Sequence, residues 1–320
     1  MNKPKVSIVV VNHNGKNLLE ALLKSISKSD YKNHEILVVD NNSTDGSREF
    51  VKKTHKNAKL VENKENLGYV GINSALRYCK GEYILFLNND MELDKNCIKN
   101  LVKTIESDKD AAMAAPKLVN FYNKKLGSGG TWVSRAFYNG HIKGSGKDAV
   151  REIPYLGVGL IKKDFVEKFG YLFDPDYFIY AEDLDLGLRV RLNGKKILFE
   201  PNAIMYHMHA LTTQKASKAF TTFLMERNSL ITLFKVLSLK NILIFLPYAK
   251  LMRFLAVIKD LLSLNFGNAF ARIKAFFWVA SHMGLIYKKR KAVQKFRKSD
   301  DRFILKVFRE KYMFRKKFIV

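Results

Sequence analysis

Short apolar runs and helical patterns alternate along the first third of the chain. The apolar runs predict buried strands at residues 6–11, 35–39, 58–61, 83–87 and 111–119. Between them, apolar residues recur at helical spacing and predict helices near residues 18–26, 47–56, 71–79 and 95–106. This order predicts an α/β fold, with a mostly parallel sheet and helices on both of its faces.

The pattern changes at about residue 120 and again at about residue 213. Glycine clusters between residues 120 and 153 predict loops and hairpins. A strand, two helices and a last strand are then predicted at residues 156–161, 164–169, 182–193 and 196–199. Beyond residue 213 the helical patterns are long and turn signals are few. We therefore expect an α/β domain over residues 1–213 and a helical region over residues 214–320.

Charged residues interrupt the apolar runs of this helical region. The apolar runs lie at residues 242–246, 251–258 and 276–286, and Lys250, Arg253, Lys259 and Asp260 interrupt the first two. Because a spanning helix needs about 20 mostly apolar residues, we expect no helix to cross a membrane. Basic helices with one apolar face fit an arrangement in the membrane interface. A soluble helical cap packed on the core is the alternative.

The charge of the chain is large and unevenly distributed. The net charge is +26, and residues 221–320 hold 22 Lys and Arg against 5 Asp and Glu. This asymmetry predicts a polyanionic partner, such as membrane phosphates, nucleic acid or an anionic substrate. A general contribution to solubility is the alternative.

Two features bear on the compartment. Cys79 and Cys97 fit no CxxC or zinc-type spacing, which favours free thiols in a reducing compartment. The apolar run at residues 6–11 is too short for a signal peptide, so we expect the protein to stay in the cytoplasm.

Polar clusters follow three of the predicted strands. They are Asn12-His13-Asn14, Asp40-Asn41-Asn42-Ser43 and Asn88-Asn89-Asp90. Because ligands bind at the carboxyl ends of the strands in open α/β sheets, three such clusters predict one shared site. The chain has no GxGxxG segment after the first strand and no GxxxxGK[ST] segment, so dinucleotide and P-loop sites are disfavoured.

Acidic and histidine side chains could supply the chemistry of this site. Asp90 at a strand end could hold Mg²⁺ or Mn²⁺ against a leaving diphosphate, although Asx turns produce the same pattern. Residues 182–185 contain three carboxylates at a helix start, which fits either complementation of the helix dipole or a general base. His207 and His209 share one face of an extended segment and could complete a metal shell.

Taken together, these segments resemble the family 2 glycosyltransferases. The similar segments are residues 6–15, 36–47, 65–73, 81–90, 180–189 and 206–207. The third is similar to the family's N-x-G-[FY]-x-x-G-x-N segment, and the fourth to the strand that leads to its DxD-type motif. The fifth resembles the ED motif of the rhamnosyltransferase-like branch. The segments occur in the family's order and span roughly residues 5–210.

The resemblance implies a GT-A fold, an inverting mechanism and a nucleotide-diphosphate sugar donor, such as dTDP-rhamnose or a UDP-hexose. It implies that Asp183 is the general base and that Glu182 beside it contacts the acceptor. It implies that Asp90 holds Mg²⁺ or Mn²⁺, with His207 as a further ligand. Asn88 stands at the first position of the DxD-type motif, where Asp is usual, which leaves Asp90 as the only carboxylate of that motif.

Donor binding is implied for a further group of residues. Asp40 is expected to contact the base of the nucleotide, with Asn12 and Asn66 nearby. The other expected donor-binding residues are Asn41, Gly68, Asn73, Asn88 and Asn89.

We therefore expect a glycosyltransferase of cell-surface polysaccharide synthesis that is peripheral on the inner face of the cell membrane. Its expected acceptor is a glycan or lipid-linked molecule, and its expected further partner is an anionic membrane surface rather than nucleic acid. Two alternatives remain: a sugar-phosphate nucleotidyltransferase, and a non-enzymatic basic protein that binds membrane or nucleic acid. The donor sugar, the nucleobase, the linkage and the oligomeric state are left open.

Overall fold

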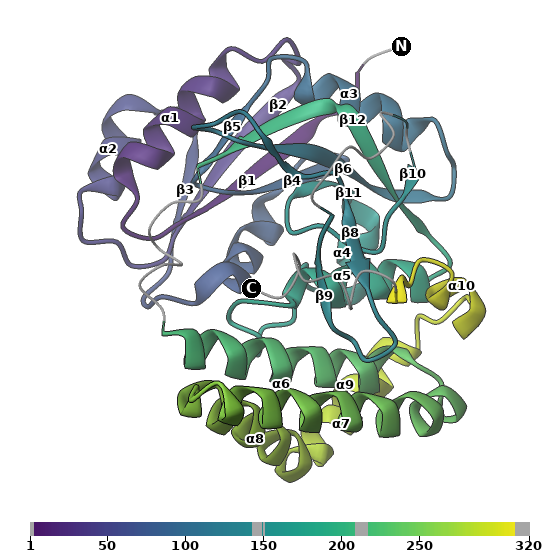
Figure 1. Ribbon diagram of the computed structural model, residues 1–320. Helices are drawn as coiled ribbons and strands as arrows, with labels where there is room; N and C mark the ends of the chain where they lie inside the picture. Colours follow the sequence, from purple (N-terminus) through teal and green to yellow (C-terminus); the bar gives the residue numbers. More distant parts are fainter. Residues whose placement is uncertain (1–2, 143–148, 150, 209–216, 311–320) are drawn as a thin grey trace.

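The computed structural model describes residues 3–142, 149, 151–208 and 217–310. Its central feature within these residues is a ten-stranded sheet with a layer of long helices beneath it (Figure 1). The strands of this sheet are β1 (Val6–Asn12), β2 (His34–Asp40), β3 (Lys59–Glu62), β4 (Tyr83–Asn88), β5 (Met91–Leu93), β6 (Ala111–Asn120), β7 (Leu126–Ser128), β10 (Arg151–Glu152), β11 (Gly159–Lys162) and β12 (Lys196–His207). β8 (Thr131–Val133) and β9 (Asn139–His141) form a separate hairpin.

The helices cover the sheet and extend beyond it. They are α1 (Lys16–Ser27), α2 (Ser47–Thr54), the 3₁₀ helix η1 (Gly68–Tyr78), α3 (Cys97–Glu106), α4 (Lys163–Phe169), α5 (Glu182–Leu192), α6 (Lys218–Val236), α7 (Leu239–Leu262), α8 (Phe266–Ser281), α9 (Met283–Gln294) and α10 (Asp301–Leu305). In Figure 1, α6 lies between the sheet and the outer helices α7 and α8.

The main path of the sheet has the order β10-β12-β6-β11-β4-β1-β2-β3. β1 pairs in parallel with β2 and β4, and β12 pairs in parallel with β6, which confirms the expected mostly parallel sheet. β11 differs, because it runs antiparallel between β4 and β6. An apolar run of four residues has the same pattern in either direction, so the sequence carried no signal for this reversal.

The core follows the apolar pattern of the sequence. Most residues of β1 are buried, as expected for a strand covered on both faces. The stripe Leu19, Leu22, Leu23 and Ile26 of α1 packs into the same core. These elements fix the carboxyl ends of β1, β2 and β4 at one edge.

Two elements differ in detail from the expectations, and a third region agrees with them. The predicted helix at residues 71–79 is a 3₁₀ helix that begins at Gly68. Phe178 lies against Gly68, and Asn41 lies against Gly71. The last predicted strand, residues 196–199, continues to His207 through an irregularity after Glu200. The described part of the region from residue 120 to residue 153 contains an expected hairpin, formed by β8 and β9.

The expectation that no helix is long and apolar enough to span a membrane is wrong. α7 has 24 residues and meets this criterion by length and composition. It continues through Pro247 and past Lys250 and Arg253, which the sequence suggested as interruptions. Arg253 does not interrupt the apolar surface of α7, because its side chain is buried against Glu226 of α6.

Candidate active site

A cavity of about 570 Å³ opens at the carboxyl ends of β1 and β4. Ten of the predicted site residues line it: Asn12, Asn41, Asn66, Gly68, Asn88, Asn89, Asp90, Glu182, Asp183 and His207. They come from strand ends, from η1, from the start of α5 and from the end of β12. The structure therefore brings the expected donor, metal and general-base residues together in a cavity of the size that small ligands occupy.

Asp40 and Asn73 are the two predicted site residues that do not line this cavity. The buried carboxylate of Asp40 accepts hydrogen bonds from Asn12 Nδ2 at 3.1 Å and from the backbone N–H of Ser43 at 2.8 Å. The side chain of Asn73 donates to the carbonyl of Phe173 at 2.7 Å and accepts from its N–H at 3.2 Å. Both side chains form hydrogen bonds within the protein near the cavity. Their contact with a donor stays a prediction.

Asparagine side chains connect the ends of the strands to one another. Asn89 Nδ2 donates to Asn12 Oδ1 at 2.7 Å, and Asn12 in turn donates to Asp40. A Cβ at Gly15 would lie 2.1 Å from Asn89 Nδ2, so only glycine leaves room for this side chain. The strand-end amides are thus fixed before any ligand binds.

Asn41 joins β2 to the start of η1. Its Nδ2 donates to the carbonyl of Gly68 at 2.6 Å, and Asn66 Oδ1 accepts from the N–H of Gly68 at 2.9 Å. Gly68 has a φ of +66°, and a Cβ there would lie 2.4 Å from the carbonyl oxygen of Phe178. A glycine is therefore required both by the backbone conformation and by the close approach of the chain before α5.

Asp90 and His207 form a pair on the wall of the cavity. His207 Nε2 lies 3.1 Å from Asp90 Oδ2, and β5 and β12 bring the two side chains together. His209, which the sequence placed beside His207, lies outside the described residues. The pair offers one oxygen and one nitrogen donor to the cavity.

Glu182 and Asp183 begin α5 at the cavity. Desolvation raises the pKa of Asp183 to about 6, and desolvation together with the charge of Asp183 raises the pKa of Glu182 well above its ordinary value. The charge of Asp183 is among the causes that raise the pKa of Glu182, so Asp183 is the carboxyl that ionises first. A Cβ at Gly157 would lie 3.3 Å from Asp183 Oδ2, so the glycine leaves space beside this oxygen.

The turn that leads into α5 has an unusual backbone. Phe178, Tyr180 and Ala181 all have positive φ values, between 60° and 68°. Such conformations cost free energy in residues other than glycine and persist only where the surroundings hold them. The buried side chain of Asn228 on α6 donates to the carbonyl of Tyr180 at 2.7 Å and to that of Tyr177 at 3.1 Å.

A buried ion-pair network joins the same turn and α5 to the C-terminal helices. Lys235 of α6 is fully buried, and its Nζ lies 2.5 Å from Asp174 Oδ2 and 2.6 Å from Asp185 Oδ1. Asp185 also pairs with Arg189, and Lys289 of α9 pairs with Asp174. The helix that carries Asp183 is therefore held by charges from α6, and α6 and α9 meet at the same carboxylate.

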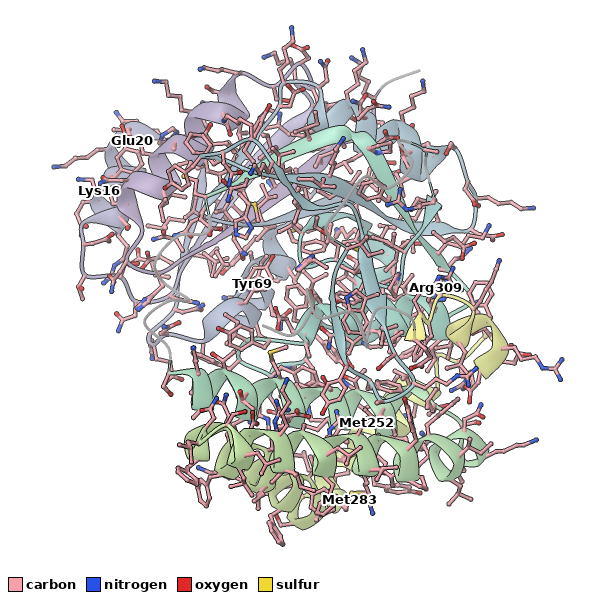
Figure 2. All side chains as sticks on the ribbon, in the orientation of Figure 1. Lys16, Glu20, Tyr69, Met252, Met283 and Arg309 are labelled. Atoms are coloured by element: carbon pink, nitrogen blue, oxygen red, sulfur yellow. The ribbon has the colours of Figure 1, made fainter. Side chains whose placement is uncertain are left out.

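The sequence analysis assigned no individual role to several residues that line the cavity. They include His13, Tyr69, Ser128, His141, Tyr180 and Phe220. His13 and Tyr69 lie inside segments with a recognisable pattern, and that pattern could have identified them. Tyr69 donates to the carbonyl of Gly157 at 2.6 Å, and Figure 2 shows it between the sheet and the helical layer. Phe220 comes from α6, far away in the sequence, and belongs to no motif.

The comparisons with known proteins cover the strand-end part of this site. Residues 7–150 match the model of glycosyl transferase family 2. The matched segment contains the polar ends of β1, β2 and β4 together with Asp90, and it ends before Asp183 and His207. The placement of those last two residues in the site therefore rests on the structure.

One curated relative is the GalNAc(5)-diNAcBac-PP-undecaprenol beta-1,3-glucosyltransferase of Campylobacter jejuni subsp. jejuni serotype O:2. It is 32% identical over 105 residues, which cover 31% of this chain and 34% of the relative. The chain thus matches about a third of the length of that relative.

Solved structures establish the fold as GT-A. GalNAc-T7 with UDP, GalNAc and Mn²⁺ superimposes with a TM-score of 0.61 and 19% identity, covering 73% of this chain and 48% of that one. Staphylococcus aureus TarS 1–349 in complex with UDP gives a TM-score of 0.55 and 19% identity, covering 72% and 66%. At these identities the likeness concerns the fold alone.

Proposed function

We propose that the chain is an inverting glycosyltransferase that uses a nucleotide-diphosphate sugar, dTDP-rhamnose or a UDP-hexose. The observation that carries the proposal is the placement of Asp183, with a pKa of about 6, in one cavity with the Asp90–His207 pair. A general base works best with a pKa near the working pH. The family match over residues 7–150 supports the reaction class.

In the proposed reaction, Asp183 takes the proton of an acceptor hydroxyl while the acceptor oxygen attacks the anomeric carbon. A new carbon–oxygen bond forms on one face of the sugar, and the bond to the diphosphate breaks on the other face with its electron pair. The configuration at that carbon therefore inverts, and no covalent intermediate with the enzyme is needed. Burial and the charge of Asp183 raise the pKa of Glu182, and in its protonated form Glu182 can donate a hydrogen bond to the acceptor.

The burial of Glu182 supports this role. Its Oε2 is buried and has no hydrogen-bond partner among the described residues. A buried polar atom of this kind is costly unless a ligand or solvent satisfies it. An acceptor hydroxyl in the cavity would supply the partner that the protein does not.

The Asp90–His207 pair fits a divalent cation such as Mg²⁺ or Mn²⁺. Asp90 would supply a carboxylate oxygen and His207 an imidazole nitrogen, ligand types that these ions accept. Within the described part of the chain, no group of three or more His, Cys, Asp or Glu side chains is arranged for a metal. Diphosphate oxygens and water would complete the shell, and the cation would neutralise charge on the departing diphosphate.

We also propose a glycan or lipid-linked acceptor in polysaccharide synthesis, and a peripheral position on the cytoplasmic face of the membrane. The relative from C. jejuni carries an undecaprenol-linked substrate in its name, and that supports an acceptor of this class here. The basic C-terminal helices support the membrane position.

The donor half of the proposal is tested by thermal unfolding with UDP, dTDP and a panel of their sugars, with and without Mn²⁺. A ligand present at 100 times its dissociation constant should stabilise the folded state by about 2.7 kcal/mol. We expect one nucleotide series to raise the melting temperature of the wild type and to lose most of this effect in Asp90→Ala. No shift with any nucleotide would contradict the proposal.

A further inference from the structure

The outer helices present a large apolar surface to solvent. On α8 the exposed residues Phe266, Phe270, Ile273 and Phe277 follow one another at intervals of four, three and four, which places them on one face of the helix. On α7 the exposed apolar residues beyond its first turn are Leu243, Ile244, Leu251, Phe254, Leu255, Ile258, Leu261 and Leu262. We name these twelve residues the α7–α8 face. Most monomeric proteins expose no contiguous apolar patch of this extent without a binding role.

Figure 1 shows α7 and α8 side by side on the side of α6 that faces away from the sheet. In Figure 2, Met283, which follows α8, lies at the outer edge of the molecule. The α7–α8 face is therefore open to a partner that approaches from the side opposite to the sheet.

Buried charges hold α7 and α8 against the rest of the protein. Glu226 of α6 is buried and pairs with Arg253 of α7, at 2.7 Å, and with Arg272 of α8. Arg253 also donates to the carbonyl of Ala136, in the turn between β8 and β9, at 2.7 Å. If α7 left this position to cross a bilayer, these buried charges would lose their partners, which typically costs several kcal/mol. These contacts therefore hold α7 parallel to the plane of the α7–α8 face.

The charge around the α7–α8 face selects its partner. Residues 239–299 contain thirteen Lys and Arg and one acidic residue, Asp260, which pairs with Arg272. Exposed lysines at positions 240, 250, 259 and 274 come from the same two helices as the face. A second copy of the chain would bring these like charges together, whereas anionic lipid headgroups complement them.

We propose that the α7–α8 face lies flat in the headgroup region of an anionic bilayer, with its apolar side chains at the boundary of the acyl chains. Amphipathic helices bind in this way, with their apolar face buried about 5–10 Å. The lysines supply an attraction that salt weakens.

The docking face and the cavity approach each other at the N-terminal end of α6. Phe220 lines the cavity, and Thr222, two residues later on α6, contacts Asn268 of α8 with 3.3 Å between the side-chain oxygens. Asn268 lies two residues beyond Phe266, where the α8 stripe begins. One end of the docking face therefore adjoins the rim of the cavity. On the basis of the proposed function, the acceptor is a lipid-borne molecule that enters from the bilayer.

The test is flotation with vesicles of phosphatidylcholine alone or with phosphatidylglycerol, at low and high salt. We expect wild type to float with the anionic vesicles at low salt and to be released at high salt. The double variant Phe270→Glu/Phe277→Glu should partition at least about a hundredfold more weakly, because two aromatic rings lose their burial. Tyr122→Glu is the matched control, since Tyr122 is equally exposed but lies in the turn between β6 and β7.

Equal flotation of wild type and the double variant, or no flotation of wild type with anionic vesicles, would overturn the docking face. A wild-type dimer that the double variant dissociates, without any flotation, would assign the face to a second copy. Both variants should keep the wild-type melting temperature and its shift with UDP. A wild type that floats but does not respond to UDP or dTDP would count against the proposed function and leave the docking intact.

Depth measurements distinguish a flat α7 from a spanning one. In a background with both tryptophans replaced, Trp132→Phe and Trp278→Phe, Leu251→Trp places a reporter at the middle of α7 and Phe270→Trp places one on α8. We expect bromines near the headgroups to quench both reporters more strongly than bromines deep in the acyl chains. Stronger quenching of Leu251→Trp by the deep bromines would show that α7 crosses the bilayer.

Discussion

At the scale of single residues, the two adjacent carboxylates at the start of α5 have different environments. Glu182 is buried, while Asp183 is half-buried and accepts a hydrogen bond from the N–H of Leu184 at 2.8 Å. Desolvation raises both pKa values, and the charge of Asp183 raises that of Glu182 further. One carboxylate can then act as a base while its neighbour remains a hydrogen-bond donor.

The raised pKa of Asp183 predicts opposite effects of pH on activity and on stability. Transfer should increase as the pH rises through about 6, because only the ionised carboxylate accepts the proton. The folded state holds this proton more tightly than the unfolded state, whose pKa is 3.8. Stability from this group is therefore complete below pH 3.8 and is lost as the pH rises through about 6.

Asp183→Asn removes that titration. The melting temperature of the variant minus that of wild type should therefore be larger at pH 7 than at pH 4. Thermal unfolding at both pH values measures the difference. Asp164→Asn, at an exposed position of α4, is the control and should show no such trend. A constant difference for Asp183→Asn across this range would contradict the raised pKa.

The Asp90–His207 pair predicts dependence on a divalent cation. Asp90→Ala should lose productive donor binding, and EDTA should inhibit the wild type until Mg²⁺ or Mn²⁺ is restored. Titration calorimetry with UDP, with and without Mn²⁺, follows the same site without turnover. Full activity in EDTA would remove the metal role from both side chains.

At the scale of elements, the turn before α5 depends on α6. Three features distinguish it: the positive φ values of Phe178, Tyr180 and Ala181, the hydrogen bonds from the amide of Asn228, and the buried Lys235. Asn228 and Lys235 lie about fifty residues from the carbonyls and carboxylates that they bind and carry no motif. Sequence patterns report local periodicity, so this dependence could be found only from the structure.

Lys235→Met tests the buried network. Asp174 and Asp185 would each lose a charged partner in a fully buried place, which should lower the free energy of unfolding by about 3 kcal/mol or more. Urea unfolding measures this loss. Lys28→Met, an exposed substitution of the same kind beyond α1, should stay within about 0.5 kcal/mol of wild type. Equal midpoints for the two variants would show that the network contributes little.

Much of the site could be predicted because its residues follow apolar strands directly. Asn12, Asn88 and Asp90 lie at or just beyond such strand ends, and the topology of a parallel sheet brings those ends together. The direction of β11 and the 3₁₀ form of η1 could not be predicted, because they depend on contacts with distant segments. The continuity of α7 was not expected because charged residues, Arg253 among them, interrupt its apolar run in the sequence, whereas the structure buries Arg253 against Glu226.

At the scale of the whole molecule, α6 packs on both α5 and the outer helices. The predicted boundary at residue 213 would separate Lys235 from Asp174 and Asp185 and remove the buried residues of α6. We expect a chain of residues 1–213 to lack a cooperative thermal transition, and the full chain to show one. A soluble 1–213 fragment with a sharp transition would support the boundary as predicted and would make the C-terminal region an independent unit.

The central claim, transfer of a sugar with Asp183 as the base, is tested most directly by acceptor-dependent release of nucleoside diphosphate. Wild type and Asp183→Asn would be incubated with UDP- and dTDP-sugars, Mn²⁺ and a bacterial lipid extract, and the labelled sugar in the lipid fraction would be measured. We predict that one donor supports lipid-dependent release and labelling by wild type. Asp183→Asn should be slower by about 10²–10⁴-fold and should still bind the donor. Release at equal rates by both proteins, or by neither with any donor, would contradict the account.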